Sequence, residues 1–556
     1  MPTRADQLAA LAETPFDVLV IGGGITGAGV ARDAAMRGLA VALVERDDFA
    51  SGTSSRSSRL VHGGVRYLEH GYLGLVFESS RERRALLRIA PHLVRPLEFT
   101  WPVYRGARVP RWKLGAGLFL YDALALFRNV GRHRRLSRDD VLTREPRLRP
   151  DHLTGGASYW DAATDDTRLT LANALDAARA GAVVVNHCAV TALVHDDRGA
   201  VRGATVRDGL GGSSATVHAR VVVNATGPWS DDVRRLDEPA TPSGVRGTKG
   251  VHITVPRDRV GNRGAVTLVS AVDGRVMFVL PAGAFTIVGT TDTATVASPD
   301  EVRATEADVD YLLRSASAAF PDARLGRADV VSAWAGIRPL IAAGFTGTAA
   351  SASREHLVAA SSSGLVTVSG GKLTTYRSMA AEVVDACERA LGREPRASAT
   401  DTTPLAGGDF RSFDAELTAA RDVTGNAAVA ERLVRAYGSE WTNVWTLADR
   451  DPALAQPIVD GLPYRKAELA WGVTRELACT LADLLVRRTH IAFETPDAGL
   501  AAAAVAAETV APLLGWTDRG IARALEEYSA EAQRIFSVDA AEPATVEAEA
   551  ALAVRA

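Results

Sequence analysis

The chain has 556 residues, of which 47% are hydrophobic, so it is long enough for more than one domain with a sizeable core. Its formal net charge of −3 gives no bulk attraction to nucleic acid, and we expect no nucleic-acid partner. Cys188, Cys387 and Cys479 are far apart in apolar contexts, which favours core packing over disulfides, and no metal site is expected. No signal peptide is evident and no apolar run reaches the roughly 18 residues of a spanning helix, so we expect a cytoplasmic protein.

The first predicted unit is a strand, a glycine-rich turn and a helix. An apolar run at residues 16–21 precedes Gly22-Gly23-Gly24-Ile25-Thr26-Gly27, and a helix-like stretch follows. In such a turn Gly22 permits the tight bend, Gly24 lets backbone N–H groups approach a pyrophosphate, and Gly27 lets the helix pack closely on the strand. The N-terminus of the helix then faces the anion.

A second apolar run, residues 39–44, ends in Glu45. A carboxylate at this point accepts hydrogen bonds from an adenosine ribose and repels a 2′-phosphate, which disfavours NADP. An ordinary tight turn is the alternative interpretation of the glycines alone. The combination of strand, turn, helix, second strand and terminal acid favours a dinucleotide site.

Residues 53–69 are rich in hydroxyl groups, glycine and arginine, with little apolar periodicity. Such a segment suits a cofactor that extends along the protein, with hydroxyls on its phosphates and ribityl chain and glycines beside a flat ring. FAD fits this description better than NAD, although a solvated Ser/Arg loop has the same composition. The residues expected to contact the cofactor here are Thr53, Ser54, Ser57, Ser58, Leu60, His62, Gly63 and Gly64.

Further along, residues 183–185, 189–194 and 221–223 are predicted to be strands that return to the nucleotide-binding part. Between residues 249 and 291, β-branched runs punctuated by glycine predict antiparallel strands over the flavin face. From about residue 403, Ala, Leu, Glu and Arg follow helical spacing and predict a helical cap. Gly209-Leu210-Gly211-Gly212 is explained by a hairpin turn, so no second nucleotide fingerprint is expected.

These patterns predict an α/β protein with a Rossmann-like FAD-binding domain, an antiparallel-sheet substrate domain and a C-terminal helical cap domain. The FAD-binding domain is predicted to be discontinuous. The predicted limits are 1–105, 170–245 and 330–395 for the FAD-binding domain, 106–169 and 246–329 for the substrate domain, 400–536 for the helical domain, and 537–556 for a tail that is frayed or disordered.

Several motifs occur in one order along the chain: residues 22–27, 54–69, 224–229, 289–292, 336–340, 370–376 and 476–489. On these motifs the chain resembles the FAD-dependent, quinone-linked glycerol-3-phosphate dehydrogenases of the glycine-oxidase/D-amino-acid-oxidase superfamily. The resemblance implies FAD as cofactor and oxidation of sn-glycerol 3-phosphate to dihydroxyacetone phosphate, with hydride transfer to flavin N5 and electrons passed to membrane quinone. The cofactor-binding residues that it adds are Ala225, Gly227, Gly336, Gly371, Lys372, Leu373 and Thr374.

The resemblance also implies the substrate-binding residues, which are Arg66, Tyr67, Arg338 and Lys372. Arg66 and Tyr67 match residues on the phosphate side, whereas Arg338 and Lys372 match residues beside the carbon that loses hydride. Guanidinium groups bind phosphate or carboxylate bidentately, whereas lysine acts as a point charge. For any one arginine, a surface salt bridge is the alternative interpretation.

Oxidation of a secondary alcohol requires a base and an anion-stabilising cation beside the hydroxyl group. His252 matches a family position near the reacting carbon and is the candidate base, while Arg338 is the candidate for stabilising the developing alkoxide. Lys372, after the Gly370-Gly371 turn, is expected to favour the reduced flavin. A hydrogen-bonded core histidine explains His252 equally well.

Residues 101–135 are basic around an apolar run at residues 114–127, with Asp122 as the one acid. The cations are Arg105, Arg108, Arg111, Lys113, Arg128, Arg132, Arg134 and Arg135. This pattern resembles an interfacial anchor, and the alternative is a buried helix with solvated basic ends. Because the family's enzymes deliver electrons to membrane quinone, we expect peripheral attachment to the inner face of the cell membrane.

Three other functions stay open at this stage. Two share the chemistry: a glycerol-3-phosphate oxidase that uses oxygen, and an FAD-dependent 2-hydroxyacid dehydrogenase. The third is a flavin-bearing RNA-binding or sensory protein without turnover. The sequence also leaves open a homodimer, the identity of the base and covalent attachment of the flavin.

Overall fold

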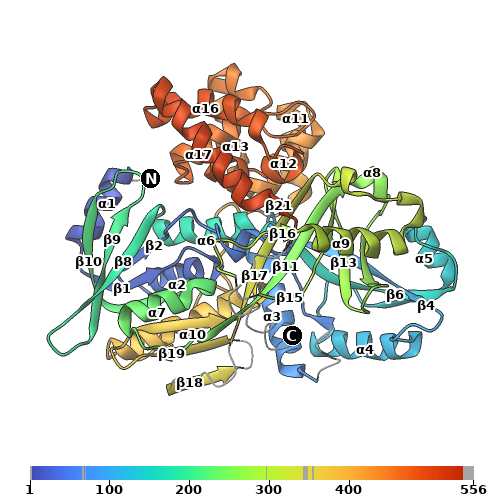
Figure 1. Cartoon of the computed structure of the whole chain (residues 1–556), viewed down its shortest axis with the longest axis horizontal. Coiled ribbons are helices and arrows are strands. Elements are labelled where there is room, and N and C mark those ends of the chain that lie inside the picture. The colour runs from blue at the N-terminus through green and yellow to red at the C-terminus, as the bar shows by residue number, and fades with distance from the viewer. Residues whose placement is uncertain are drawn as a thin grey trace, which may run out of the picture.

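The structure is a computed structural model that describes residues 3–65, 68, 71–295, 297–341, 348–353 and 356–541. Arg66, Tyr67 and residues 542–556 of the predicted tail lie outside the described residues. Figure 1 shows two sheets side by side with a group of helices above them. The α/β class, with a nucleotide-binding sheet, a second sheet and C-terminal helices, is therefore as predicted.

The first sheet has nine strands among the described residues, and its centre is parallel. The strand β1 (Phe16–Ile21) lies between β2 and β10, as expected of a strand that is covered on both faces. The other strands of this sheet are β2 (Val41–Val44), β7 (Val183–Val185), β8 (Cys188–His195), β9 (Val201–Asp208), β10 (Ser214–Asn224), β18 (Thr348–Ser353), β19 (His356–Ala360) and β20 (Val366–Gly370). The strands β9 and β10 pair antiparallel around the predicted hairpin turn.

Helices cover both faces of this sheet because successive side chains of a strand point to opposite sides. Val18 and Val20 of β1 pack with α2 (Ile25–Met36), α6 (Asp166–Arg179) and α10 (Tyr376–Ala390). Leu19 and Ile21 pack on the other side with α1 (Arg4–Glu13) and α7 (Ser230–Asp237). The turn between β1 and α2 is thereby fixed at the carboxyl edge of the sheet.

The second sheet has ten strands among the described residues and is antiparallel except where β12 meets β4. Its strands are β3 (Leu60–Val61), β4 (Val94–Tyr104), β5 (Arg134–Leu136), β6 (Leu153–Thr164), β11 (Val245–Pro256), β12 (Ala265–Val269), β13 (Val276–Ala282), β14 (Phe285–Gly289), β15 (Thr293–Ala294) and β17 (Ser332–Ile341). The expected antiparallel strands between residues 249 and 291 are all present.

Three strands of the second sheet, β3, β4 and β17, lie elsewhere than the predicted domain limits place them. Those limits assigned all three to the FAD-binding part, whereas β3 and β4 pair with β6 and β17 pairs with β11. None of these segments was predicted as a strand, and a local pattern would not have named its partner in any case. The domain limits themselves stay predictions.

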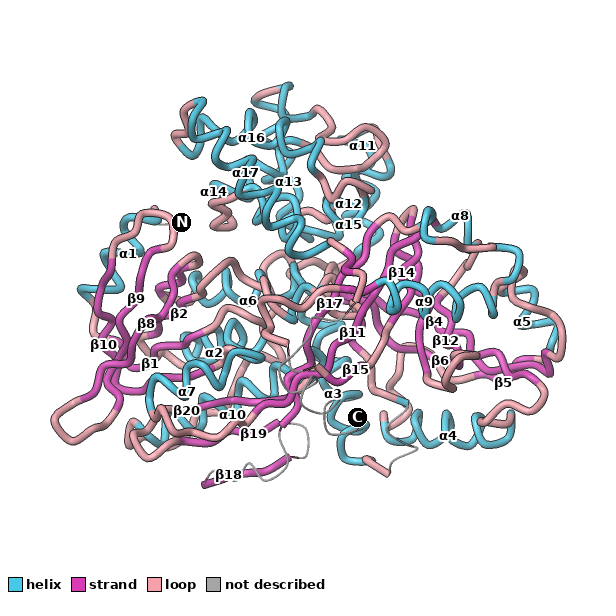
Figure 2. Tube along the Cα trace, in the orientation of Figure 1, coloured by secondary structure: helices cyan, strands magenta, loops and turns pink. Residues whose placement is uncertain are grey.

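The remaining helices flank the second sheet or form the C-terminal group (Figure 2). Those near the sheet are α3 (Leu73–Ile89), α4 (Arg111–Leu124), α5 (Arg138–Arg144), α8 (Arg257–Val260) and α9 (Glu306–Ala319). The C-terminal group contains α11 (Phe413–Thr424), α12 (Ala427–Tyr437), α13 (Trp441–Arg450), α14 (Lys466–Arg475), α15 (Ile491–Glu494), α16 (Leu500–Leu514) and α17 (Asp518–Phe536). After α17, the short strand β21 (Val538–Asp539) pairs with β16 (Ala304–Thr305).

Candidate functional site

A cavity of about 930 Å³ is lined by residues of both sheets. It lies at the carboxyl ends of β1 and β2, where open α/β sheets bind their ligands. All but two of the predicted cofactor-binding residues line it: Gly22, Gly24, Ile25, Thr26, Glu45, Thr53, Ser54, Ser57, Ser58, Leu60, His62, Gly64, Ala225, Gly227, Gly336, Gly371, Lys372, Leu373 and Thr374. The two exceptions are Gly27 and Gly63, which are not among the residues that line the cavity.

The glycine turn has the backbone shape that a phosphate cradle requires. Gly22 has a φ of 107°, and a Cβ atom there would lie 2.8 Å from the carbonyl oxygen of Ala225. A Cβ atom at Gly27 would collide with the carbonyl oxygen of Gly22, so Gly27 acts by close packing. Ser54 Oγ accepts the N–H of Ile25 at 2.9 Å and so contributes to the end of α2.

Glu45 stands at the end of β2 and faces the same turn. Its carboxylate accepts the N–H of Gly23 at 2.5 Å and the N–H of Asp47 at 2.9 Å. Burial raises the pKa of Glu45 above its ordinary value. The carboxylate therefore holds the turn in place as well as lining the cavity.

The hydroxyl groups of the Ser/Thr segment have protein partners, which sequence reasoning did not anticipate. Thr53 Oγ1 donates to the carbonyl of Ile337 at 2.6 Å, and Ser57 Oγ donates to Asp166 at 2.6 Å. These bonds tie the segment to β17 and α6, and the contacts of Thr53 and Ser57 with the cofactor stay predictions. Their partners lie 284 and 109 residues away in the chain, so no local pattern reveals them.

His252 lies on β11 and lines the cavity. Its Nε2 is 2.8 Å from Ser58 Oγ, and its ring stacks on Trp334 with centroids 5.5 Å apart. Nδ1 is buried with no hydrogen-bond partner among the described residues. Burial, and then the positive charges of Arg338 and Arg59, lower the pKa of His252 to about 3, so the imidazole is neutral near pH 7.

Arg338 and Lys372 line the same cavity as His252. Arg338 Nη1 pairs with Asp292 Oδ1 at 3.0 Å, and Nη2 is 3.4 Å from Thr290 Oγ1. Lys372 follows Gly371, which has a φ of 91° that favours glycine. Sequence reasoning assigned no role to the motif at residues 289–292. In the structure two of its residues, Thr290 and Asp292, contact the guanidinium group of Arg338.

A buried polar cluster behind Gly63 was missed from the sequence. Asp161 Oδ1 accepts the N–H of Gly63 at 3.0 Å and the hydroxyl of Tyr121 at 2.6 Å, and Arg83 also pairs with it. A Cβ atom at Gly63 would collide with the Tyr121 hydroxyl. Burial lowers the pKa of the neighbouring His62 to about 4, so this imidazole is also neutral near pH 7.

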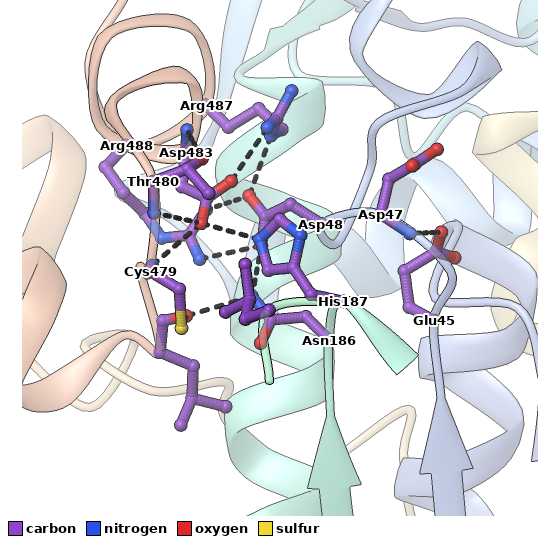
Figure 3. A network of polar contacts seen from close by, with 12 residues as sticks. Glu45, Asp47, Asp48, Asn186, His187, Cys479, Thr480, Asp483, Arg487 and Arg488 are labelled. Carbon is purple, nitrogen blue, oxygen red and sulfur yellow. Dashed lines mark hydrogen bonds and ion pairs between the residues drawn. The ribbon is translucent and has the colours of Figure 1, made fainter. Parts of the chain in front are cut away.

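A second buried network joins the C-terminal helices to the end of β2 (Figure 3). Asp48 accepts from Arg487 Nε at 2.7 Å and Arg488 Nη1 at 2.6 Å, while Asp483 pairs with Arg487 at 2.8 Å and with His187 Nε2 at 2.9 Å. The ligand-type atoms of Asp48, His187 and Asp483 lie within 4.8 Å of one another. Both carboxylates are paired with arginine, which accounts for the cluster as a set of ion pairs between two parts of the fold.

Comparisons with known proteins agree over nearly the whole chain. Residues 17–377 match the family described as FAD dependent oxidoreductase, and residues 398–521 match the C-terminal domain of alpha-glycerophosphate oxidase. Glycerol-3-phosphate dehydrogenase 2 of Mycobacterium tuberculosis is 41% identical over 95% of this chain and 90% of its own length. The chain belongs to the FAD-dependent glycerol-3-phosphate dehydrogenases.

Other members of the glycerol-3-phosphate dehydrogenase family agree with this placement. The human mitochondrial glycerol-3-phosphate dehydrogenase is 38% identical over 93% of this chain and 73% of its own length. The solved glycerol-3-phosphate dehydrogenase of Bacillus halodurans, complexed with FAD, is 33% identical, has a TM-score of 0.80 and covers 98% of this chain and 99% of its own. Glycine oxidase from Geobacillus kaustophilus, 20% identical with a TM-score of 0.52, shares the fold.

The family, the enzyme class and FAD as cofactor are therefore as the sequence predicted. The residues present fit the cofactor, because the glycine turn, the N-terminus of α2 and Glu45 line one cavity to which both sheets contribute residues. Among the described residues, no helix is both long and apolar enough to cross a membrane.

Proposed function

We propose that this chain oxidises sn-glycerol 3-phosphate to dihydroxyacetone phosphate and passes the electrons to a membrane quinone. The observation that carries the proposal is the meeting of Arg338, Lys372 and His252 on the cavity that holds the predicted cofactor contacts. The names of the relatives point to the same substrate. When bound, FAD supplies the hydride acceptor at N5 that oxidation of the alcohol requires.

The cations of the cavity suit a phosphorylated alcohol. Arg338 presents a planar guanidinium that Asp292 holds in place, and Lys372 adds a second positive charge at the wall. In this proposal Arg338 stabilises the developing alkoxide, and Arg66 and Tyr67 bind the phosphate as the family resemblance implies. A 2-hydroxyacid carries a carboxylate and no phosphate, so substrates of the two kinds separate the two functions experimentally.

His252 is the proposed base. Its lowered pKa keeps the imidazole neutral near pH 7 and also makes it a weaker base, and Ser58 and Trp334 fix the orientation of the ring. The positive charge of Arg338 stabilises the alkoxide and so makes the substrate hydroxyl easier to deprotonate. A weaker base then suffices for this step.

The helix α4 supports attachment to a membrane, where a quinone acceptor resides. Leu118 and Tyr121 face the core, whereas Trp112 is 72% exposed and Phe119 is 59% exposed. Asp122, the one acid of the segment, is buried and bonds Asn129 and His133, so it leaves the outer face apolar and basic. We propose peripheral attachment through this face to the inner side of the cell membrane.

The test is anaerobic loss of the flavin's visible absorbance after addition of sn-glycerol 3-phosphate, with lactate and 2-hydroxyglutarate as controls. Bleaching by the phosphate alone is expected. Bleaching by a hydroxyacid alone would overturn the assigned substrate, and an oxidised flavin with all three, in protein that binds RNA, would favour the non-enzymatic alternative.

The acceptor needs a separate measurement. Reduced enzyme is expected to transfer electrons to a soluble quinone analogue much faster than to oxygen. Stoichiometric peroxide with slow quinone reduction would identify an oxidase. Finding all of the protein in the soluble fraction after gentle lysis at low salt would contradict membrane attachment.

A further inference from the structure

A second cavity, of about 480 Å³, lies between α3, the C-terminal end of α4 and the loop at residues 398–401. It shares no lining residue with the cofactor cavity. The helices α3 and α4 lie along the lower edge of Figure 1, on the side away from the C-terminal helices. The cavity therefore opens beside the helix that the proposed function places on a membrane.

Arginine dominates the wall of this cavity. Five arginines line it, against the two carboxylates of Glu82 and Asp401: Arg81, Arg84, Arg88, Arg128 and Arg377. Glu82 is buried and holds Arg377 through two hydrogen bonds of 2.7 and 2.6 Å, so one acid is fully committed to the fold. The wall keeps an excess of three positive charges, which favours an anion.

Two of these arginines are available to a ligand. Arg84, on α3, and Arg128, just beyond α4, are exposed and make no side-chain ion pair or hydrogen bond within the described part of the chain. Arg88 differs, since it donates to the carbonyl oxygen of Asp401. The guanidinium groups of Arg84 and Arg128 come from two different segments of the cavity wall, and each can donate hydrogen bonds to phosphate oxygens.

The rim of the cavity is apolar. Phe77 is 42% exposed and Leu126 is 55% exposed, and both line it, while Phe127 beside them is 49% exposed. An inorganic anion makes no favourable contact with these apolar side chains. A molecule with a phosphate head and acyl chains gains from both the guanidinium groups and the apolar side chains.

We propose that this cavity binds the phosphodiester headgroup of an anionic glycerophospholipid. The inference rests on the proposed membrane attachment and deepens it, because it replaces a diffuse basic surface with one defined headgroup site. Arg84 and Arg128 contact the phosphate, and Phe77 and Leu126 contact the start of the acyl chains. Occupation of the cavity sets the depth and rotation of α4 at the membrane.

The experiment compares Arg84→Gln/Arg128→Gln with Arg132→Gln/Arg134→Gln, which removes two exposed arginines from the same segment outside the cavity. Each FAD-loaded protein is titrated calorimetrically with short-chain phosphatidylglycerol below its micelle concentration, then with short-chain phosphatidylcholine and with inorganic phosphate. Flotation with phosphatidylcholine vesicles, with and without phosphatidylglycerol, follows.

We expect wild type to bind one phosphatidylglycerol per chain, and the cavity variant to bind it roughly 10- to 30-fold more weakly while the control variant matches wild type. Equal losses in both variants would overturn the site in favour of diffuse attraction. Binding of inorganic phosphate as tightly as the lipid would overturn the lipid as ligand.

Two further readouts keep this inference separate from the proposed function. Oxidation of sn-glycerol 3-phosphate with a soluble dye acceptor is expected to be unchanged in both variants, because neither touches the cofactor cavity. Wild type that oxidises the substrate but floats with neither kind of vesicle would overturn membrane attachment and this site together, and leave the chemistry standing.

Discussion

The hydroxyl of Tyr121 donates a 2.6 Å hydrogen bond to Asp161. Tyr121 belongs to the inner face of α4, whose outer face exposes Trp112 and Phe119. Asp161 in turn accepts the N–H of Gly63, in the segment beside the cofactor. One carboxylate thus joins the exposed helix to the wall of the active-site cavity.

Tyr121→Phe removes one of the donors to this buried carboxylate. We expect the free energy of unfolding to fall by about 1–3 kcal/mol, because a buried charge loses a partner, and FAD retention to weaken with it. Thermal or urea unfolding and flavin release on dilution measure the two effects. Tyr104→Phe is the control, since the Tyr104 hydroxyl donates to the carbonyl of Arg149 away from the cavity. Equal flavin loss in both variants would contradict the link to Asp161.

Gly27→Ala tests whether close packing beneath the glycine turn is needed to bind the cofactor. The added methyl group meets the carbonyl oxygen of Gly22, which is backbone and cannot rotate away. We expect purified protein with much less flavin and a loss of stability of about 1–3 kcal/mol or more. Gly74→Ala, in α3, meets no atom within 4 Å and is expected to keep full flavin. A flavin-saturated Gly27→Ala variant would show that close packing here is dispensable.

The sequence predicted those parts of the site that are local. The turn at residues 22–27 and Glu45 are written in one strand–turn–helix–strand unit, so their roles follow from short-range geometry. The partners of Asp161 are different, because Tyr121 is 40 residues away and Gly63 is 98 residues away. No pattern within a single strand or helix predicts contacts between residues so far apart in the chain.

The fold was predictable to the same degree. The β-branched runs between residues 249 and 291 predicted the antiparallel strands found there, whereas β4 and β17 were not predicted, and their sheet is decided by long-range pairing with β6 and β11. Arg338 was selected by motif, whereas the ion pair with Asp292 that positions it needed the structure. Residue type therefore predicted which side chains carry the chemistry, and tertiary contacts decided how those side chains are oriented.

Arg338→Lys keeps the positive charge but loses the planar fork of donors. We expect kcat/KM for sn-glycerol 3-phosphate to fall roughly 10- to 100-fold, the effect of one charge-assisted hydrogen bond, with flavin content unchanged. Arg259→Lys is the matched control, because Arg259 also pairs with an aspartate, Asp329 at 2.8 Å, outside the cavity. A wild-type kcat/KM in Arg338→Lys would remove Arg338 from the proposed mechanism.

His187 makes the contact between the two parts of the fold depend on pH. Burial alone lowers its pKa, but the carboxylate of Asp483 at 2.9 Å and that of Asp48 outweigh burial and the opposing charge of Arg487, so the pKa is raised above 6.5. A folded-state pKa above the unfolded value means that the protonated pair stabilises the protein fully below about pH 6.5. That stabilisation is lost as the pH rises through the raised pKa.

His187→Gln should therefore destabilise the protein more at pH 6 than at pH 9, by about 1–3 kcal/mol at the lower pH. Glutamine still donates a hydrogen bond to Asp483, so the difference between the two pH values isolates the charge. Melting temperatures of wild type and variant at both pH values measure it, with the less buried His195→Gln, whose partner is Asp237, as the control. A loss at pH 9 as large as that at pH 6 would mean that His187 stabilises the contact as a neutral side chain, and that the arginines alone neutralise Asp48 and Asp483.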